Sequence, residues 1–187
     1  MVRGIVKRAL AVLVLLAAAP HDVRAGPAGP AAVLFEEGVP PDVQALTRTT
    51  WDRFVSAFPA RAECLHPVIV VAARELQHRA GYDPARHVVR IRIPGTAPNL
   101  SASLIHGFAH HLEFTCPAHR GLRGPFLAAQ GLPPRAPWFE GPSWEQTPSE
   151  QFAEAVVEAV LGERHAHARI PISHGAILAI RAWGLGK

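Results

Sequence analysis

The only long apolar run of this chain lies close to its N-terminus and limits what the chain can fold into. Residues 9–19 are all apolar, but this run is 11 residues long, whereas a helix needs about 20 residues to cross a bilayer. A membrane protein with several spans is therefore excluded. Apolar residues make up 49% of the chain, which is typical of a single globular domain with a packed core.

The surroundings of this run are typical of a secretory signal peptide. Three basic residues precede the run, and the sequence Val-Arg-Ala at 23–25 follows it as a small-residue exit. We interpret residues 1–25 as a signal peptide that is cleaved after Ala25, which predicts a secreted chain without a stable membrane span. An uncleaved N-terminal anchor is the alternative. Residues 26–40 are expected to form a flexible leader, and residues 41–187 a single domain.

Loss of residues 1–25 changes the charge of the chain. Four basic residues and one acidic residue leave, so the formal net charge at neutral pH falls from +4 to +1. A surface this close to neutral gives no electrostatic reason to expect binding to nucleic acid.

The two cysteines of the mature chain, Cys64 and Cys116, are expected to form a disulfide. An even number of cysteines in an exported chain favours pairing. A bridge that closes a loop of 51 residues would stabilise the fold by about 4 kcal/mol on the chain-entropy model. Two buried free thiols are the alternative.

The apolar periodicities along the chain predict an α+β fold. Apolar residues at helical spacing predict a helix over 42–58, and two short runs of β-branched residues predict strands over 68–71 and 88–93. Asn99 and Thr147 are expected to cap two later helices. The remaining segments predict helices over 100–114, 120–130, 147–161 and 174–183, a loop over 131–148, and a strand over 164–172.

Two histidines of the helix predicted over 100–114 form the first candidate site. His106 and His110 are one turn apart on the same face, so both imidazoles can reach one metal ion. Two such histidines with a third ligand from another element make a zinc site. Because the spacing of the pair is weak evidence by itself, two neutral packed histidines are the alternative.

The helix predicted over 147–161 offers three carboxylates as the third ligand. On a helical wheel, Glu150 lies inside the apolar arc, Glu154 at its border and Glu158 toward solvent. A buried carboxylate needs a partner. We therefore expect Glu150 to be the buried glutamate of the three and the third metal ligand.

These two helices resemble the gluzincin-like metallopeptidases, in particular the type seen in the catalytic domain of anthrax lethal factor. That family has H-E-x-x-H on one helix and roughly E-x-F-A-E on a later helix. The matching residues here are H-G-F-A-H at 106–110 and E-Q-F-A-E at 150–154. The resemblance covers about residues 87–162 and includes the order of strand, first helix, loop and glutamate helix.

The resemblance implies a fold, a metal site and a class of substrate. The fold would be zincin-like, with a small sheet packed against the active-site helix and the glutamate-bearing helix. The metal would be zinc, held by His106, His110 and Glu150, with Glu154 as a supporting carboxylate outside the ligand set. The substrate would be a peptide or a protein.

The chain departs from the family motif at the residue after the first histidine. The family has a glutamate there that acts as general base, and this chain has Gly107. General acid–base assistance contributes about 10²–10⁴-fold, so we expect weak or absent peptidase activity, as in a pseudoenzyme. His111 is the candidate substitute base, with a half-exposed helix histidine as the alternative. Trp144 stands near the place of a tyrosine that family members often carry.

Several other residues have ordinary structural interpretations. Glu113 is two turns from His106 and is expected to be a surface carboxylate. His165 and His167 are interpreted as exposed strand residues rather than as a second metal pair. Three aromatic residues are expected to pack in the core or in a lid, with the lining of a pocket as the alternative: Trp138, Phe139 and Trp144.

Three functions remain open on the sequence. The first is a secreted, metallopeptidase-like protein that keeps a zinc site but has little or no catalytic activity. The second is an active metalloenzyme whose base comes from elsewhere, for example from His111. The third is a metal-free secreted binding or scaffold module. The metal content of the protein separates the third function from the others, and a peptidase assay separates the first two.

Overall fold

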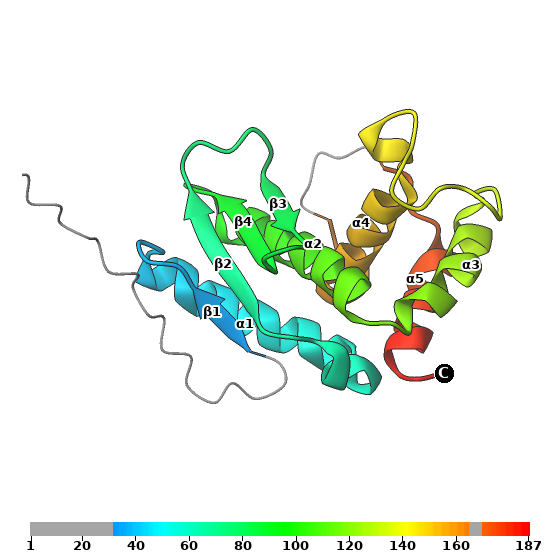
Figure 1. The fold of residues 1–187 in the computed structure, drawn as a ribbon, viewed down its shortest axis with the longest axis horizontal. Coiled ribbons are helices and arrows are strands. Elements are labelled where there is room, and N and C mark those ends of the chain that lie inside the picture. The colour runs from blue at the N-terminus through cyan, green and yellow to red at the C-terminus, as the bar shows by residue number, and fades with distance from the viewer. Residues whose placement is uncertain (1–31, 165–169) are drawn as a thin grey trace, which may run out of the picture.

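One sheet of four short strands lies within residues 32–164 and 170–187, the part of the chain that the computed structural model describes. Its strand order is β1-β2-β4-β3 (Figure 1). β1 pairs in parallel with β2, and β2 pairs in parallel with β4. β3 pairs antiparallel with β4 and forms one edge of the sheet. The strands span Val33–Phe35 (β1), Val68–Ala73 (β2), Ala80–Asp83 (β3) and Val88–Arg92 (β4).

The apolar residues of the two central strands explain why these segments are strands. Val68 and Val70 of β2 are fully buried, as are Val89 and Ile91 of β4. Residues two apart in a strand point to the same face, so both strands present an apolar face to the helices. The predicted strands over 68–71 and 88–93 are confirmed.

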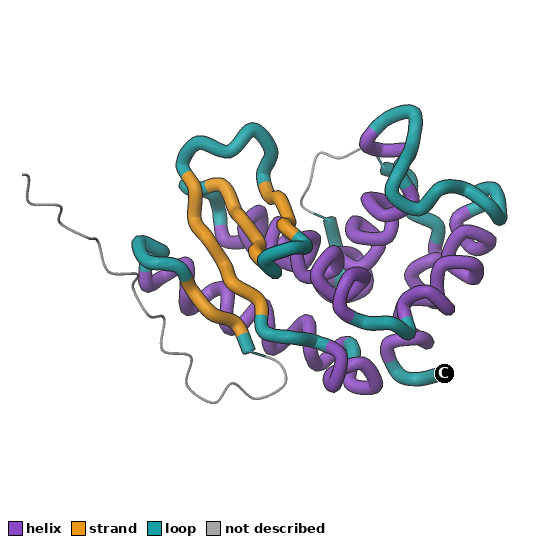
Figure 2. Tube along the Cα trace, viewed as in Figure 1, coloured by secondary structure: helices purple, strands orange, loops and turns teal. Residues whose placement is uncertain are grey.

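Two long helices pack against that face of the sheet. They are α1 (Pro41–Ala57) and α2 (Ala97–Thr115). Trp51 of α1 lies edge-on against Phe108 of α2, with 4.8 Å between the ring centroids. Figure 2 shows both helices running beside the strands. Large rings at this junction form the main core between the sheet and the helices.

Three further helices lie away from the sheet: α3 and α4 contact α2, and α5 packs on α3 and α4 (Figure 1). α2 contacts β4 and β3 on one side and α4 on the other, so it is the central helix of the fold. The predicted helices at these positions are confirmed. Their bounds are His119–Gln130 (α3), Pro148–Leu161 (α4) and His174–Gly184 (α5).

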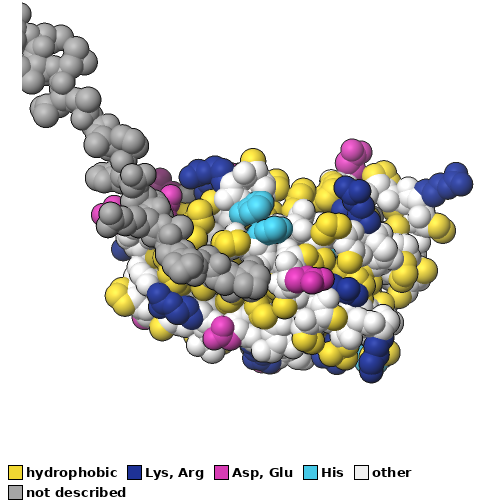
Figure 3. Space-filling view, turned by 60° about the horizontal axis from the view of Figure 1, so that its bottom comes forward, with side chains coloured by type: hydrophobic (Ala, Val, Ile, Leu, Met, Phe, Trp, Pro, Cys, Tyr) yellow, Lys and Arg dark blue, Asp and Glu magenta, His cyan; other side chains and the backbone are white. Residues whose placement is uncertain are grey.

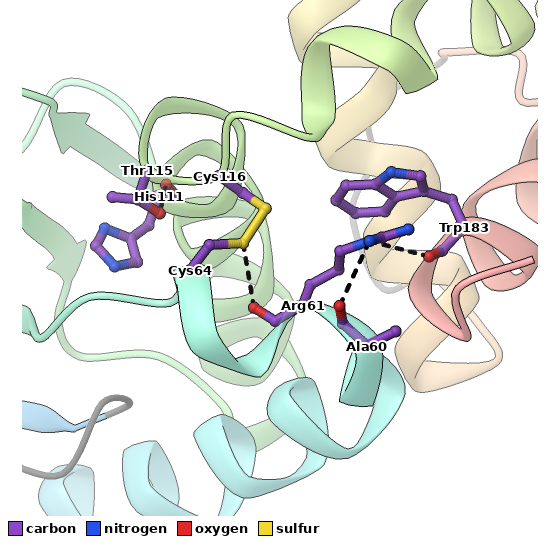
Figure 4. Close-up of a disulfide and its surroundings, with 7 residues drawn as sticks. All are labelled: Ala60, Arg61, Cys64, His111, Thr115, Cys116 and Trp183. Atoms are coloured by element: carbon purple, nitrogen blue, oxygen red, sulfur yellow. Dashed lines mark hydrogen bonds between the residues drawn. A yellow bond between two sulfur atoms is a disulfide. The ribbon is translucent and has the colours of Figure 1, made fainter.

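The predicted disulfide between Cys64 and Cys116 is confirmed, with 4.9 Å between the Cα atoms. Cys64 ends a short 3₁₀ helix, η1 (Pro59–Cys64), and Cys116 directly follows α2, so the bond ties the segment after α1 to the end of α2 (Figure 4). Arg61, also in η1, donates to the carbonyl oxygen of Trp183 at 3.1 Å. A disulfide is typical of a protein that folds in an oxidising compartment.

Two predicted helix caps differ from the structure. Asn99 lies inside α2, which begins at Ala97 because Pro98 fits the first turn of a helix. Thr147 does stand at the N-cap position of α4, but its hydroxyl donates to the carbonyl oxygen of Ser143 instead of accepting from the helix.

Two strands were not predicted. β1 lies within residues 26–40, which were expected to form a flexible leader, and its pairing with β2 makes residues 33–35 part of the sheet. β3 lies between the two predicted strands, where its four residues pair with β4.

Some predictions concern residues outside the described part of the chain. These are the signal peptide over 1–25, the histidines His165 and His167, and most of the strand predicted over 164–172. Among the residues that the structure describes, no helix combines the length and the apolarity needed to cross a bilayer. On the face seen in Figure 3, basic and acidic side chains are scattered among apolar ones.

Candidate metal site

The side chains of His106, His110 and Glu150 meet between α2 and α4. The two Nε2 atoms are 3.1 Å apart. Glu150 Oε2 lies 3.2 Å from His106 Nε2 and 3.5 Å from His110 Nε2. Within the described residues, this is the one group of three or more His, Cys, Asp or Glu that could hold an ion together. The fold thus brings the predicted ligand set to one point.

The separations between these three atoms fit a tetrahedral zinc ion. Bonds of about 2.0 Å at tetrahedral angles place ligand atoms about 3.3 Å apart. Glu150 Oε2 is buried and accepts no hydrogen bond from any described residue. A buried carboxylate oxygen beside two ring nitrogens is a donor set suited to a cation.

Each histidine of the site is oriented by a second carboxylate. His106 Nδ1 lies 3.0 Å from Glu154 Oε1, and His110 Nδ1 lies 2.8 Å from Glu113 Oε1. A proton on Nδ1 that is donated to a carboxylate leaves the lone pair of Nε2 available to a metal. Glu154 therefore lies beside the ring of His106 and outside the three candidate ligands, and Glu113 lies beside the ring of His110 in the same way.

Glu113 was expected on the surface, and this expectation is wrong. Its side chain is fully buried. It accepts hydrogen bonds from Ser149 Oγ at 2.7 Å and from Trp138 Nε1 at 2.8 Å. The prediction considered only the axial distance from Glu113 to His106, although His110 is three residues away and residues at that spacing are neighbours on a helix. This spacing is the sequence signal that could have found Glu113.

The predicted order of burial among the glutamates of α4 is also wrong. The side chain of Glu154 is 2% exposed, whereas that of Glu150 is 21% exposed. Glu158 is 32% exposed and pairs with Arg164. α4 packs against several helices and is buried on most of its surface. A wheel with a single apolar arc does not describe such a helix.

The carboxylates of the site favour positive charge at its centre. Burial opposes a charged imidazole at His110, but the neighbouring carboxylates of Glu113 and Glu150 raise its pKa to about 9. Burial also opposes the charged form of Glu150, yet the two histidines hold the pKa of this carboxyl well below its usual value. The site therefore attracts a cation, which can be a proton or a metal ion.

Gly107 faces the sheet and has no room for a side chain. A Cβ atom added to Gly107 would lie 2.6 Å from Cγ1 and 3.0 Å from Cγ2 of Val89 in β4. α2 approaches β4 this closely because the helix has no side chain at that position. The glycine at position 107 is thus a packing requirement of this fold.

His111 also lies on the sheet side of α2, away from the candidate ligands. His66 O accepts a hydrogen bond from His111 Nε2 at 2.7 Å, and the hydroxyl of Tyr82 donates to His111 Nδ1 at 3.0 Å. Burial lowers the pKa of His111 to about 4 despite its hydrogen bond to His66. His111 is fully buried and does not line the cleft that contains the ligands. It is therefore neither half-exposed nor placed to act as a base in that cleft.

The three candidate ligands line a cleft of about 720 Å³ between the β3 edge and helices α2 and α4. Trp144 stacks on the ring of His106, with centroids 6.1 Å apart and an angle of 26° between the rings. Trp144 and Phe139 are both exposed and line this cleft, whereas Trp138 is buried as expected. Tyr82, which was not predicted as a site residue, lies on the β3 side of the cleft.

No known protein family, curated protein or solved structure matches this chain. The interpretation of the site accordingly depends on its own geometry. That geometry consists of two ring nitrogens and one carboxylate oxygen at a common point, with a second carboxylate behind each ring.

Proposed function

We propose that this chain is a secreted zinc-binding protein of zincin-like fold, related in design to the gluzincin-type metallopeptidases, and that it binds peptides with little or no hydrolysis. One observation carries the proposal. The Nε2 atoms of His106 and His110 and the Oε2 atom of Glu150 lie 3.1–3.5 Å from one another, the spacing that a tetrahedral zinc ion needs.

The surrounding residues support zinc as the cation. His106, His110 and Glu150 would hold the ion, and Glu154 and Glu113 would fix the orientation of the two rings. When bound, zinc supplies a Lewis acid that can polarise a carbonyl oxygen or activate a water molecule. A fully protein-made set of three ligands leaves a coordination position for such a molecule.

The groups around the ligands support weak or absent hydrolysis. Hydrolysis also needs a group that accepts a proton in the cleft. In the described part of the chain, the carboxylates that line the cleft are Glu113, Glu150 and Glu154, and each is engaged with a histidine of the site. Gly107 supplies no carboxylate, and His111 uses both ring nitrogens elsewhere.

The arrangement of the elements supports the fold assignment. A small sheet with an antiparallel edge strand packs on α2, which carries both histidines. α4 packs on the other side of α2 and contributes Glu150 and Glu154. The cleft between the β3 edge and these helices can hold an extended peptide, because the outer side of an edge strand has unpaired backbone groups.

The metal content of the purified, disulfide-bonded protein tests the proposal. We expect one zinc ion per chain by elemental analysis, and we expect His110→Ala to lose it. Glu145→Gln is the matched control, because Glu145 is exposed and lies outside the ligand set. A wild-type protein that takes up no zinc would contradict the proposal and favour the metal-free binding module.

A peptidase assay with casein and mixed peptides tests the second half of the proposal. We expect no cleavage above the rate of the His110→Ala variant. If the wild-type protein cleaves these substrates and a chelator abolishes the cleavage, an active metalloenzyme is favoured. Its general base would then be a group other than those considered above.

A further inference from the structure

We propose that the cleft selects peptides by two ends of different chemistry: an aromatic end that takes an apolar side chain, and a basic end that takes a carboxylate. This inference rests on the proposed function, because it assigns a class of ligand to the same cleft. The metal site lies between the two ends.

The aromatic end is formed by exposed rings near the C-terminal end of α2. Phe114 and Phe139 are 47% and 48% exposed, and they stack with centroids 5.1 Å apart. The ring of Tyr82, which is half-buried, lies 5.8 Å from that of Phe114. All three residues line the cleft. A set of exposed aromatic rings within a concave site is suited to an apolar side chain.

The basic end is formed by two arginines at the opposite end of the same cleft. Arg79 directly precedes β3 and Arg92 ends β4. The backbone N–H of Arg92 donates to Arg79 O at 2.9 Å, so the two residues lie opposite each other. Both line the main cleft and also a small adjoining cavity of about 90 Å³, beside Leu100 and Ser103 of α2.

These arginines have free capacity to bind an anion. Across residues 32–164 and 170–187, no hydrogen bond or ion pair engages the guanidinium of Arg79 or Arg92. The cleft carboxylates Glu113, Glu150 and Glu154 are instead engaged at the metal site. Guanidinium groups pair with carboxylates through charge-assisted hydrogen bonds. A carboxylate of the ligand is therefore the group that fits this end.

The distance between the two ends sets the spacing of the two groups in the ligand. Ser103 marks the basic end of α2 and Phe114 the aromatic end, with His106 and His110 between them. Eleven helical residues correspond to about 16 Å, which an extended peptide covers in about five residues at roughly 3.3 Å each. The fitting ligand has an apolar residue and a carboxylate about five positions apart, on either side of the metal site.

Binding of short fluorescent peptides to the purified protein tests this inference. The reference probes are dansyl-labelled, amidated peptides with Phe and Glu five positions apart, in either order. In one variant probe Gln replaces Glu, and in a second Ala replaces Phe. In a third, Gln replaces Glu and the C-terminus is left free at that distance from Phe, so that a side-chain carboxylate can be distinguished from a C-terminal one.

Double-mutant cycles between the peptide and the protein give the decisive readout. We expect replacement of Glu by Gln to weaken binding about tenfold in wild-type protein and to have no effect in Arg79→Gln/Arg92→Gln. Likewise, we expect replacement of the peptide's Phe by Ala to weaken binding to the wild-type protein and to have no effect on binding to Phe139→Ala. Arg135→Gln and Leu178→Ala are matched controls, because both residues are exposed and neither lines the cleft.

The outcomes separate this inference from the proposed function. Coupling with an amidated peptide of either order supports the inference and identifies a side-chain carboxylate. Coupling with the free C-terminus alone also supports it and identifies a C-terminal carboxylate. If the changes in the peptide and in the protein affect the binding free energy additively, the inference is overturned. Zinc content is measured on the same samples, so a protein that binds zinc without coupling contradicts only the inference. Coupling in a protein that binds no zinc would contradict only the proposed function.

Discussion

The cleft side and the sheet side of α2 place neighbouring histidines in environments of opposite chemistry. On the cleft side, His110 lies beside the carboxylates of Glu113 and Glu150. On the sheet side, His111 contacts a tyrosine hydroxyl and a backbone carbonyl, both uncharged. Burial opposes charge on both sides, yet the pKa of His110 is raised to about 9 while that of His111 is lowered to about 4.

The difference between the two sides shows how one helix can combine a candidate metal site with a structural interface. Carboxylate partners, rather than depth of burial, decide whether an imidazole here favours a cation. The sheet side instead requires neutral groups and close packing, which Gly107 provides against Val89. Changes on the sheet side should therefore cost stability, and changes on the cleft side should cost zinc affinity.

The largest effect is expected from a side chain at Gly107. Gly107→Ala should lower the free energy of unfolding by about 1–3 kcal/mol because its Cβ overlaps Val89, and Gly107→Glu should lower it further. Restoring the motif glutamate should for this reason yield no peptidase. Urea unfolding of the purified variants measures the effect.

A glycine with open space around it provides the control for this prediction. Gly124 lies inside α3 with no atom within 4 Å of an added Cβ. Gly124→Ala should therefore keep the stability or raise it by up to about 1 kcal/mol. Adding Val89→Ala to Gly107→Ala should recover part of the loss. A Gly107→Ala variant as stable as wild type would contradict the close packing on the sheet side.

Acidification should remove stability through His111. The pKa of this group lies near 4 in the folded chain against an ordinary 6.5, so between these values the unfolded chain takes up a proton and the folded chain does not. The stabilisation is complete above pH 6.5 and is lost as the pH falls through 4, by about 3 kcal/mol in total. Urea midpoints measured between pH 7.5 and 4.5 check this.

A variant with a non-titrating side chain isolates the contribution of His111. Gln at position 111 keeps a donor and an acceptor, so His111→Gln should show a flatter pH dependence over this range. His119, whose pKa is lowered to about 3 by burial and by Arg123, contributes with the same sign and leaves part of the slope. An unchanged slope in His111→Gln would contradict the neutral assignment of this residue.

On the cleft side, removal of the charge at Glu113 should weaken zinc binding. Glu113→Gln loses the carboxylate that orients His110, and such changes typically cost about 10–100-fold in metal affinity. Competition with a chromophoric chelator measures the affinity, and Glu140→Gln at an exposed position outside the ligand set is the control. Equal affinities in Glu113→Gln and wild type would contradict the role of this carboxylate.

The smallest effect is expected from the hydroxyl of Tyr82. Tyr82→Phe removes the hydrogen bond to His111 Nδ1 and should cost about 1 kcal/mol of stability. Because this contact lies on the sheet side, zinc affinity should stay unchanged. A loss of zinc affinity without a loss of stability would mean that the two sides of α2 are not separate.

The sequence predicted those elements whose apolar residues follow a clear period. α1, α2 and β4 bury large side chains at regular spacing, and each was expected within a few residues of its observed bounds. β3 was missed because its sequence, Ala-Gly-Tyr-Asp, has no alternation of apolar residues. β3 is a strand because it pairs with β4. The local sequence does not encode this pairing.

The sequence also predicted one part of the candidate site, the three candidate ligands, and missed the carboxylates behind them. The spacing of His106 and His110 and the position of Glu150 required only the geometry of two helices. The buried carboxylates behind the rings depended on how α2 and α4 pack, so the burial order of Glu150 and Glu154 and the role of Glu113 were missed. The tight contact at residue 107 depended on the distance between α2 and the sheet.

X-ray absorption at the zinc K-edge of the purified protein tests the central claim most directly. The geometry predicts one zinc per chain with only nitrogen and oxygen in its first shell at about 2.0 Å, including the outer-shell signal of two imidazoles. In His106→Ala and His110→Ala this signal should disappear with the metal. Sulfur in the first shell, a shell without imidazole, or equal zinc uptake by the two variants would contradict a site formed by His106, His110 and Glu150.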